Sequence, residues 1–171
     1  KPFTEDKFMN AIAFLEKKVK DGFIIGFRGN EYTQDLRAGN ANAVIGWSGD
    51  MFQLAAESDG KFDFAIPESG GCISTDNFMI PSTSTNAVNA SKMVNYYYDP
   101  TVAATVAAWV NYICPVKGAQ EAMEKVDPSL ANSEYIFPTA KTTSRLSIFR
   151  ALTAAEETSY QTAFQSVAGN A

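Results

Sequence analysis

The sequence of 171 residues contains no histidine. Because imidazole is the usual base of hydrolases and a common metal ligand, this absence excludes Ser-His-Asp triads, Cys-His pairs and histidine-based metal sites. Cysteine is also scarce: only Cys72 and Cys114 are present, too few for a structural zinc site without histidine. They form either two free thiols or one disulfide. We therefore expect no metal and no cofactor.

Long apolar runs and an excess of basic residues are also missing. No stretch approaches the roughly 18 apolar residues of a membrane span. Fourteen basic residues stand against nineteen acidic ones, a net charge of −5 that argues against nucleic acid and favours cationic partners. The polar N-terminal residues are not typical of a signal peptide, so we expect a mature form or an excised piece.

Short apolar runs alternate with helical patterns along the chain, which is typical of an α/β protein. Its length is sufficient for one core and does not require two domains. We predict helices over residues 4–21, 31–37, 48–54, 86–98, 101–111 and 147–168. Strands are predicted over residues 23–27, 43–47, 62–67 and 78–81.

One of these predicted strands, residues 43–47, passes directly into the helix that starts at Ser48. Ligands bind at the carboxyl ends of strands in open α/β sheets, so Trp47, Ser48 and Asp50 lie at a candidate site. Tyr112 stands at the predicted exit of another helix, where its ring can point into a cleft. The simpler alternative is that Trp47 is a core residue and Asp50 a first-turn acid.

A turn over residues 68–77 joins two extended apolar segments. It contains the Gly70-Gly71 pair, the thiol of Cys72 and the carboxylate of Asp76. Flexible glycines between two strands predict a crossing point between two compact parts of the chain.

Several motifs in this order resemble the solute-binding proteins of polyamine (spermidine/putrescine) ABC transporters. The resemblance covers essentially the whole chain, but only about the C-terminal half of the family's usual length. The motifs that carry it are Val44–Asp50, Pro67–Gly71, Asp76-Asn77, Ile80-Pro81, Ala90–Lys92, Asp99-Pro100 and Asn111–Pro115.

The resemblance implies an α/β, two-lobed architecture: the periplasmic-binding-protein-like type II fold, of which this chain is the C-terminal portion (lobe 2 plus a segment of lobe 1). Residues 1–69 and 113–171 would form lobe 2, and residues 70–112 would be a segment of lobe 1. Because that segment carries apolar helix faces that need burial, we expect a partner chain, a domain swap or rearranged packing, and hence self-association of the fragment.

The resemblance also implies a ligand site made of Trp47, Asp76 and Tyr112. A polyamine needs carboxylates for its ammonium ends and aromatic faces for its methylenes, and these side chains supply both. Ser74 belongs to the same site, but it stands where the family commonly has an aromatic residue, so other small solutes stay open as ligands. Cys72 and Cys114 occupy positions that the family usually fills without cysteine, each close to a cleft residue, and we expect them to form a disulfide.

The function implied is that of an extracytoplasmic component of an ABC importer, which captures a polyamine and delivers it to a permease without covalent chemistry. Membrane contact would arise only through a lipid anchor outside these residues. Two other classes are a surface interaction protein without a transport role and an enzyme. The enzyme would be a glycosidase using two of the carboxylates at Asp50, Glu57, Glu68 and Asp76.

Overall fold

The structure, a computed structural model of the chain, describes residues 3–169. It divides into two compact units, which are described separately below. Unit 1 is formed by Lys1–Ile45 and Arg150–Ala171, and unit 2 by Gly46–Phe149. These units do not follow the predicted lobes, whose boundaries stay a prediction. No helix among residues 3–169 is long and apolar enough to cross a membrane.

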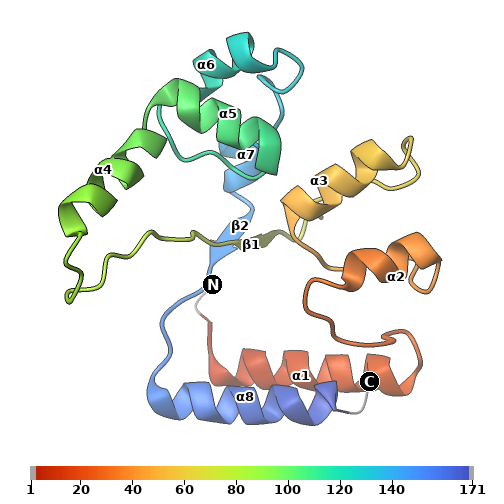
Figure 1. Cartoon of the computed structure of the whole chain (residues 1–171). Coiled ribbons are helices and arrows are strands. Elements are labelled where there is room, and N and C mark those ends of the chain that lie inside the picture. The colour runs from red at the N-terminus through yellow and green to blue at the C-terminus, as the bar shows by residue number, and fades with distance from the viewer. Residues whose placement is uncertain (1–2, 170–171) are drawn as a thin grey trace. The chain divides into compact units, whose positions relative to one another are not determined.

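Unit 1 pairs the first and last helices of the chain, which lie side by side (Figure 1). The ring of Phe8 stacks on that of Tyr160 with their centroids 4.1 Å apart. Thr4 begins the first helix as predicted, because its side chain accepts a hydrogen bond from the backbone of Lys7. The helices of unit 1 are α1 (Glu5–Lys20), α2 (Tyr32–Ala38) and α8 (Ala154–Ala168).

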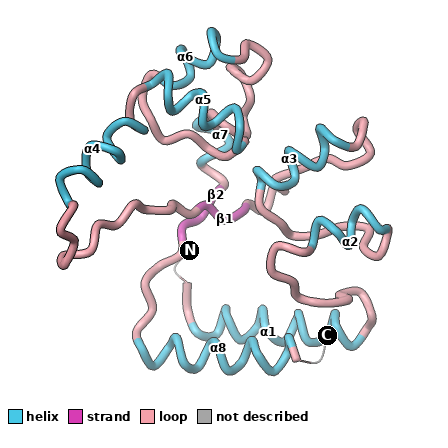
Figure 2. Tube along the Cα trace, viewed as in Figure 1, coloured by secondary structure: helices cyan, strands magenta, loops and turns pink. Residues whose placement is uncertain are grey.

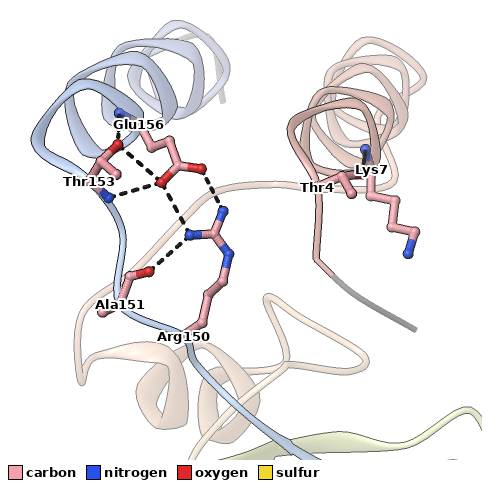
Figure 3. Close-up of polar contacts among 6 residues, drawn as sticks. All are labelled: Thr4, Lys7, Arg150, Ala151, Thr153 and Glu156. Atoms are coloured by element: carbon pink, nitrogen blue, oxygen red, sulfur yellow. Dashed lines mark hydrogen bonds and ion pairs between the residues drawn. The ribbon is translucent and has the colours of Figure 1, made fainter.

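Helix α8 begins at Ala154, so the predicted start at Ser147 is wrong. Its start is set by a capping box: Glu156 N donates to Thr153 Oγ1 at 3.3 Å, and Thr153 N donates to Glu156 Oε2 at 2.9 Å (Figure 3). Arg150 adds an ion pair of 2.7 Å to the same carboxylate. The Thr-x-x-Glu spacing was visible in the sequence and marks the true start of this helix.

This capping network predicts a pH-dependent stability. Hydrogen bonds from Arg150, and then from Thr153, lower the pKa of the Glu156 carboxyl from 4.5 to about 2. Because the pKa is lowered on folding, the contribution of ionised Glu156 is complete above pH 4.5 and is lost as the pH falls toward 2. We expect the thermal unfolding midpoint of the wild type to fall more steeply over this range than that of Glu156→Gln.

The Glu156→Gln variant is a matched comparison, because glutamine keeps the capping box but does not titrate. All other carboxyl groups titrate in both proteins, so the difference between the two pH profiles isolates Glu156. Parallel profiles would contradict this account of the network.

Unit 2 contains a pair of short strands (Figure 2). They are parallel and hydrogen bonded, in a register that places Cys72 opposite Ser147. Gly70, just before the first strand, has a φ of +104°, and a Cβ there would overlap the carbonyl oxygen of Arg145. Glycine thus permits the close approach of the two segments. The elements of unit 2 are α3 (Ser48–Glu57), β1 (Gly71–Ile73), α4 (Ala87–Tyr97), α5 (Pro100–Val110), α6 (Ala119–Val126), α7 (Ala140–Thr143) and β2 (Leu146–Ile148).

The strand predictions require correction. In the described part of the chain, residues 23–27, 43–47, 62–67 and 78–81 form no strand, whereas β1 lies inside the predicted turn and β2 overlaps the start of the predicted last helix. A strand is stable only when a neighbour accepts and donates its backbone hydrogen bonds, and apolar composition alone does not provide that neighbour. The α/β class is therefore represented here by mostly helical units with one short parallel pair.

The core of unit 2 is a cluster between α5 and α6. Alanines on α5 let α6 approach closely, and the buried members are Ala104, Ala107, Met123, Ala131 and Ile136. Helix α5, predicted over residues 101–111, begins one residue earlier: Asp99 Oδ1 accepts from the backbone of Thr101, and Pro100 occupies the first helical position. This packing joins residues on both sides of the predicted lobe boundary at 112/113.

Helix α4 has no buried residue. Val88 and Met93, which a helical pattern places on its apolar face, are 70% and 80% exposed. Apolar side chains of segment 70–112 therefore stay exposed on α4, whereas α5 packs one face on α6 and leaves Trp109 exposed.

Candidate functional site

The N-terminus of α3 presents an indole and a carboxylate from neighbouring positions. Trp47 is the N-cap residue, and its carbonyl accepts the first helical bond from Met51 at 3.1 Å while its side chain stays 54% exposed. Trp47 is thus not a core residue. Asp50 lies in the first turn, where the helix dipole stabilises a negative charge.

Tyr112 follows the C-terminus of α5, and its side chain reaches the N-terminus of α3. Asn111 ends α5 in the left-handed conformation, with φ 57° and ψ 28°, and its N–H still donates to Ala107. The chain turns there, and the Tyr112 hydroxyl donates to Asp50 Oδ1 at 2.9 Å across 62 positions of sequence. Trp47, Asp50 and Tyr112 therefore gather at the start of α3; we call them the α3 site.

The other two predicted ligand residues lie on a different segment. Ser74 and Asp76 follow β1 and are exposed, and the neighbouring Asn77 side chain donates to the Thr75 carbonyl at 3.3 Å. Their participation in one site with Trp47 and Tyr112 stays a prediction. Asp50 was not among the ligand residues that the resemblance implied. Its position close to Trp47, after a predicted strand, had nevertheless indicated it as a candidate.

The predicted disulfide is wrong for this structure, in which both cysteines are free. Cys72 is exposed on β1, whereas Cys114 is held at the α5–α6 cluster. The backbone N–H of Cys114 donates to Ile136, and its sulfur lies 4.0 Å from the Ala103 carbonyl oxygen. Closeness to cleft residues in sequence did not bring the two sulfurs together, because separate elements fix them.

The charge distribution favours a cationic ligand in the unit that contains the α3 site. Unit 2 has six basic and eleven acidic residues, so it accounts for the whole net charge of −5. An excess of acidic groups raises the local concentration of cations. Among residues 3–169 there is no cluster of three or more acidic or cysteine side chains that could hold a metal ion.

Unit 2 also has a hollow of about 420 Å³ on α5 and α6, lined by Thr105, Val106, Ala108, Trp109 and Val126. This lining contains no carboxylate, so an ammonium group there would find no opposite charge to replace its lost hydration. The hollow therefore suits a cation far less well than the α3 site does.

The chain matches the family model of bacterial extracellular solute-binding proteins over residues 3–134, and it belongs to this family. It is 27% identical over 142 residues to the spermidine/putrescine-binding periplasmic protein of Salmonella typhimurium, which covers 83% of this chain and 39% of that protein. It is also 27% identical over 125 residues to the putrescine/cadaverine-binding protein of Pseudomonas aeruginosa. That match covers 70% of this chain and 34% of that protein.

A third relative, the putrescine-binding periplasmic protein of Escherichia coli K12, is 31% identical over 98 residues, which cover 54% of this chain and 26% of that protein. The resemblance to polyamine-binding proteins is confirmed by these matches. The chain spans less than two fifths of the length of these relatives.

Proposed function

We propose that this chain is part of the extracytoplasmic solute-binding component of an ABC importer and that its ligand is a cationic polyamine. The observation that carries the proposal is the α3 site, where the Tyr112 hydroxyl meets the Asp50 carboxylate beside the exposed Trp47. The names of the relatives support the ligand class, because each of the three binds putrescine, spermidine or cadaverine by name.

The chemistry of the site matches an alkyl diammonium ion. The Asp50 carboxylate accepts the Tyr112 hydroxyl, and a carboxylate is also the acceptor that an ammonium N–H requires. Charge-assisted hydrogen bonds of this kind are about twice as strong as neutral ones. The faces of Trp47 and Tyr112 offer cation–π contacts and apolar surface to the methylenes.

A second carboxylate is required for the other end of the ligand, and we assign this role to Asp76. Ser74 lies beside it without an aromatic ring, so the ligand contact there is polar rather than stacked. A different small solute that needs fewer aromatic contacts is the alternative ligand, and the binding experiment below distinguishes the two.

We further propose that the chain is the C-terminal portion of a two-lobed protein, with the lobes as predicted, and that a permease receives the solute. The short coverage of the relatives and the exposed apolar side chains of α4 support this view. When the chain is on its own, these exposed side chains favour self-association, including domain swapping. No step in this function makes or breaks a covalent bond.

Calorimetric titration with putrescine and spermidine tests the ligand class, both for this chain and for the longer protein that contains it. We expect saturable binding of at least one amine with a negative heat-capacity change, because apolar surface is buried. The matched control is 1,4-butanediol, which keeps four methylenes but lacks the charges, and it should not bind.

Equal binding of the diol, or no heat with either amine at several temperatures, would overturn the polyamine proposal and favour another solute. Sedimentation of the same samples tests self-association. A compact monomer of the 171-residue chain that does not bind a hydrophobic dye would contradict it.

A further inference from the structure

We propose that Gly49 is a positioning residue for the α3 site. Because Gly49 has no side chain, the ring of Tyr112 can pack against the backbone of α3, and its hydroxyl then reaches Asp50. As a statement about ligand affinity, this inference rests on the proposed function. Gly49 has no side chain with which to contact a solute, so its role is to position the ring of Tyr112.

The first evidence is the contact between the Tyr112 ring and the backbone of α3. Gly49 is buried, and a Cβ placed on it would lie within 2.6 Å of Tyr112 Cζ and still closer to two other ring carbons. Real Cβ atoms essentially never approach heavy atoms to less than 3.0 Å. A methyl group at this position therefore cannot coexist with the observed ring.

The second evidence is that the segment carrying Tyr112 is tied to the same helix one turn further on. Gln53 Nε2 donates to the carbonyl oxygens of Trp109 and Val110, at 3.5 and 3.4 Å. These are terminal carbonyls of α5, which have no partner within their own helix. Gly49 and Gln53 are four residues apart and so share one face of α3.

The third evidence is the buried turn that precedes Tyr112. Asn111 is only 8% exposed, adopts a left-handed conformation, and donates from Nδ2 to the Trp109 carbonyl at 3.2 Å. With the turn and the end of α5 held in this way, the Tyr112 ring has little freedom to move away from α3. An added methyl at position 49 would then displace the ring and separate its hydroxyl from Asp50.

The experiment compares Gly49→Ala with the wild type in two independent measurements. In protein labelled with 3-fluorotyrosine, the ¹⁹F resonance of Tyr112 is assigned by its loss in Tyr112→Phe. We expect Gly49→Ala to shift this resonance in the absence of ligand. We also expect the dissociation constant for putrescine to rise about tenfold, the typical effect of losing one hydrogen bond.

Gly26→Ala is the matched control. The three heavy atoms nearest to a Cβ at Gly26 all belong to the flexible guanidinium end of Arg28, which can move away. This variant should leave both the Tyr112 resonance and the affinity unchanged. An unshifted Tyr112 resonance in Gly49→Ala would overturn the proposal.

The double variant Gly49→Ala/Tyr112→Ala separates positioning from general damage to α3. Once the ring is gone, the methyl has nothing to displace, so the double variant should match Tyr112→Ala in thermal midpoint and in affinity. A further loss in this background would overturn the proposal, and the comparison remains valid if Gly49→Ala alone folds poorly. If the wild type binds no amine, the proposed function fails, while the resonance shift still decides the role of Gly49.

Discussion

Replacing Asp50 by asparagine should lower the affinity for putrescine by about ten- to a hundredfold, the loss expected when a charge-assisted hydrogen bond becomes neutral. Asparagine has nearly the same shape and keeps an acceptor oxygen for the Tyr112 hydroxyl, which lies 2.9 Å from Asp50 Oδ1. The change therefore removes the negative charge with little change in geometry. Calorimetric titration at constant ionic strength gives the affinity of each variant.

The matched control for this prediction is Glu121→Gln. Glu121 is exposed on α6 in the same unit, and its replacement changes the net charge by the same amount. If binding depended only on a general electrostatic attraction of cations to unit 2, both variants would lose the same amount of affinity for putrescine. Equal, small losses in the two variants would therefore contradict a direct ammonium contact at Asp50.

Met123→Ala should lower the free energy of unfolding by about 2–5 kcal/mol, the range measured for removing a large side chain from a packed core. Met123 lies on α6 and is fully buried, with 0% exposure, in the cluster that includes Ala104 and Ala107 of α5. Its removal leaves a cavity that rigid helices fill only partly. Equilibrium urea unfolding followed by circular dichroism measures the loss.

Met93→Ala provides the control with the same substitution at an exposed position. Met93 on α4 is 80% exposed, so its replacement should change the free energy of unfolding by less than about 0.5 kcal/mol. A comparable loss in both variants would show that α4 is packed in solution, by self-association or another arrangement. The α5–α6 cluster would then not be the main core of unit 2.

The helix starts were predictable where their determinants lie within a few residues of one another. Thr4 begins α1 as predicted, and α5 begins within one residue of its predicted start, where Asp99 and Pro100 cap it. The start of α8 was also encoded locally, in Thr153 and Glu156, but apolar periodicity placed it too early. Capping depends on side chains that reach only the adjacent turn, so short sequence patterns suffice to identify it.

The strands and the cysteine pair were not predictable in this way. Residues 43–47 and 62–67 have strand-like composition, yet pairing depends on a neighbour that composition does not specify. The thiols of Cys72 and Cys114 stay apart because one lies on β1 and the other at the α5–α6 cluster. Only a three-dimensional arrangement determines whether two distant sulfurs meet.

By itself, the sequence determined the family, the absence of histidine chemistry, the acidic charge balance, and the identities of Trp47 and Tyr112 as candidate ligand residues. The tertiary structure alone decided that Tyr112 meets Asp50 and that Gly49 makes room for its ring. The physical reason is that composition and local patterns act within a few residues, whereas this contact joins positions 62 apart. It exists because the left-handed turn at Asn111 directs the end of α5 toward the start of α3.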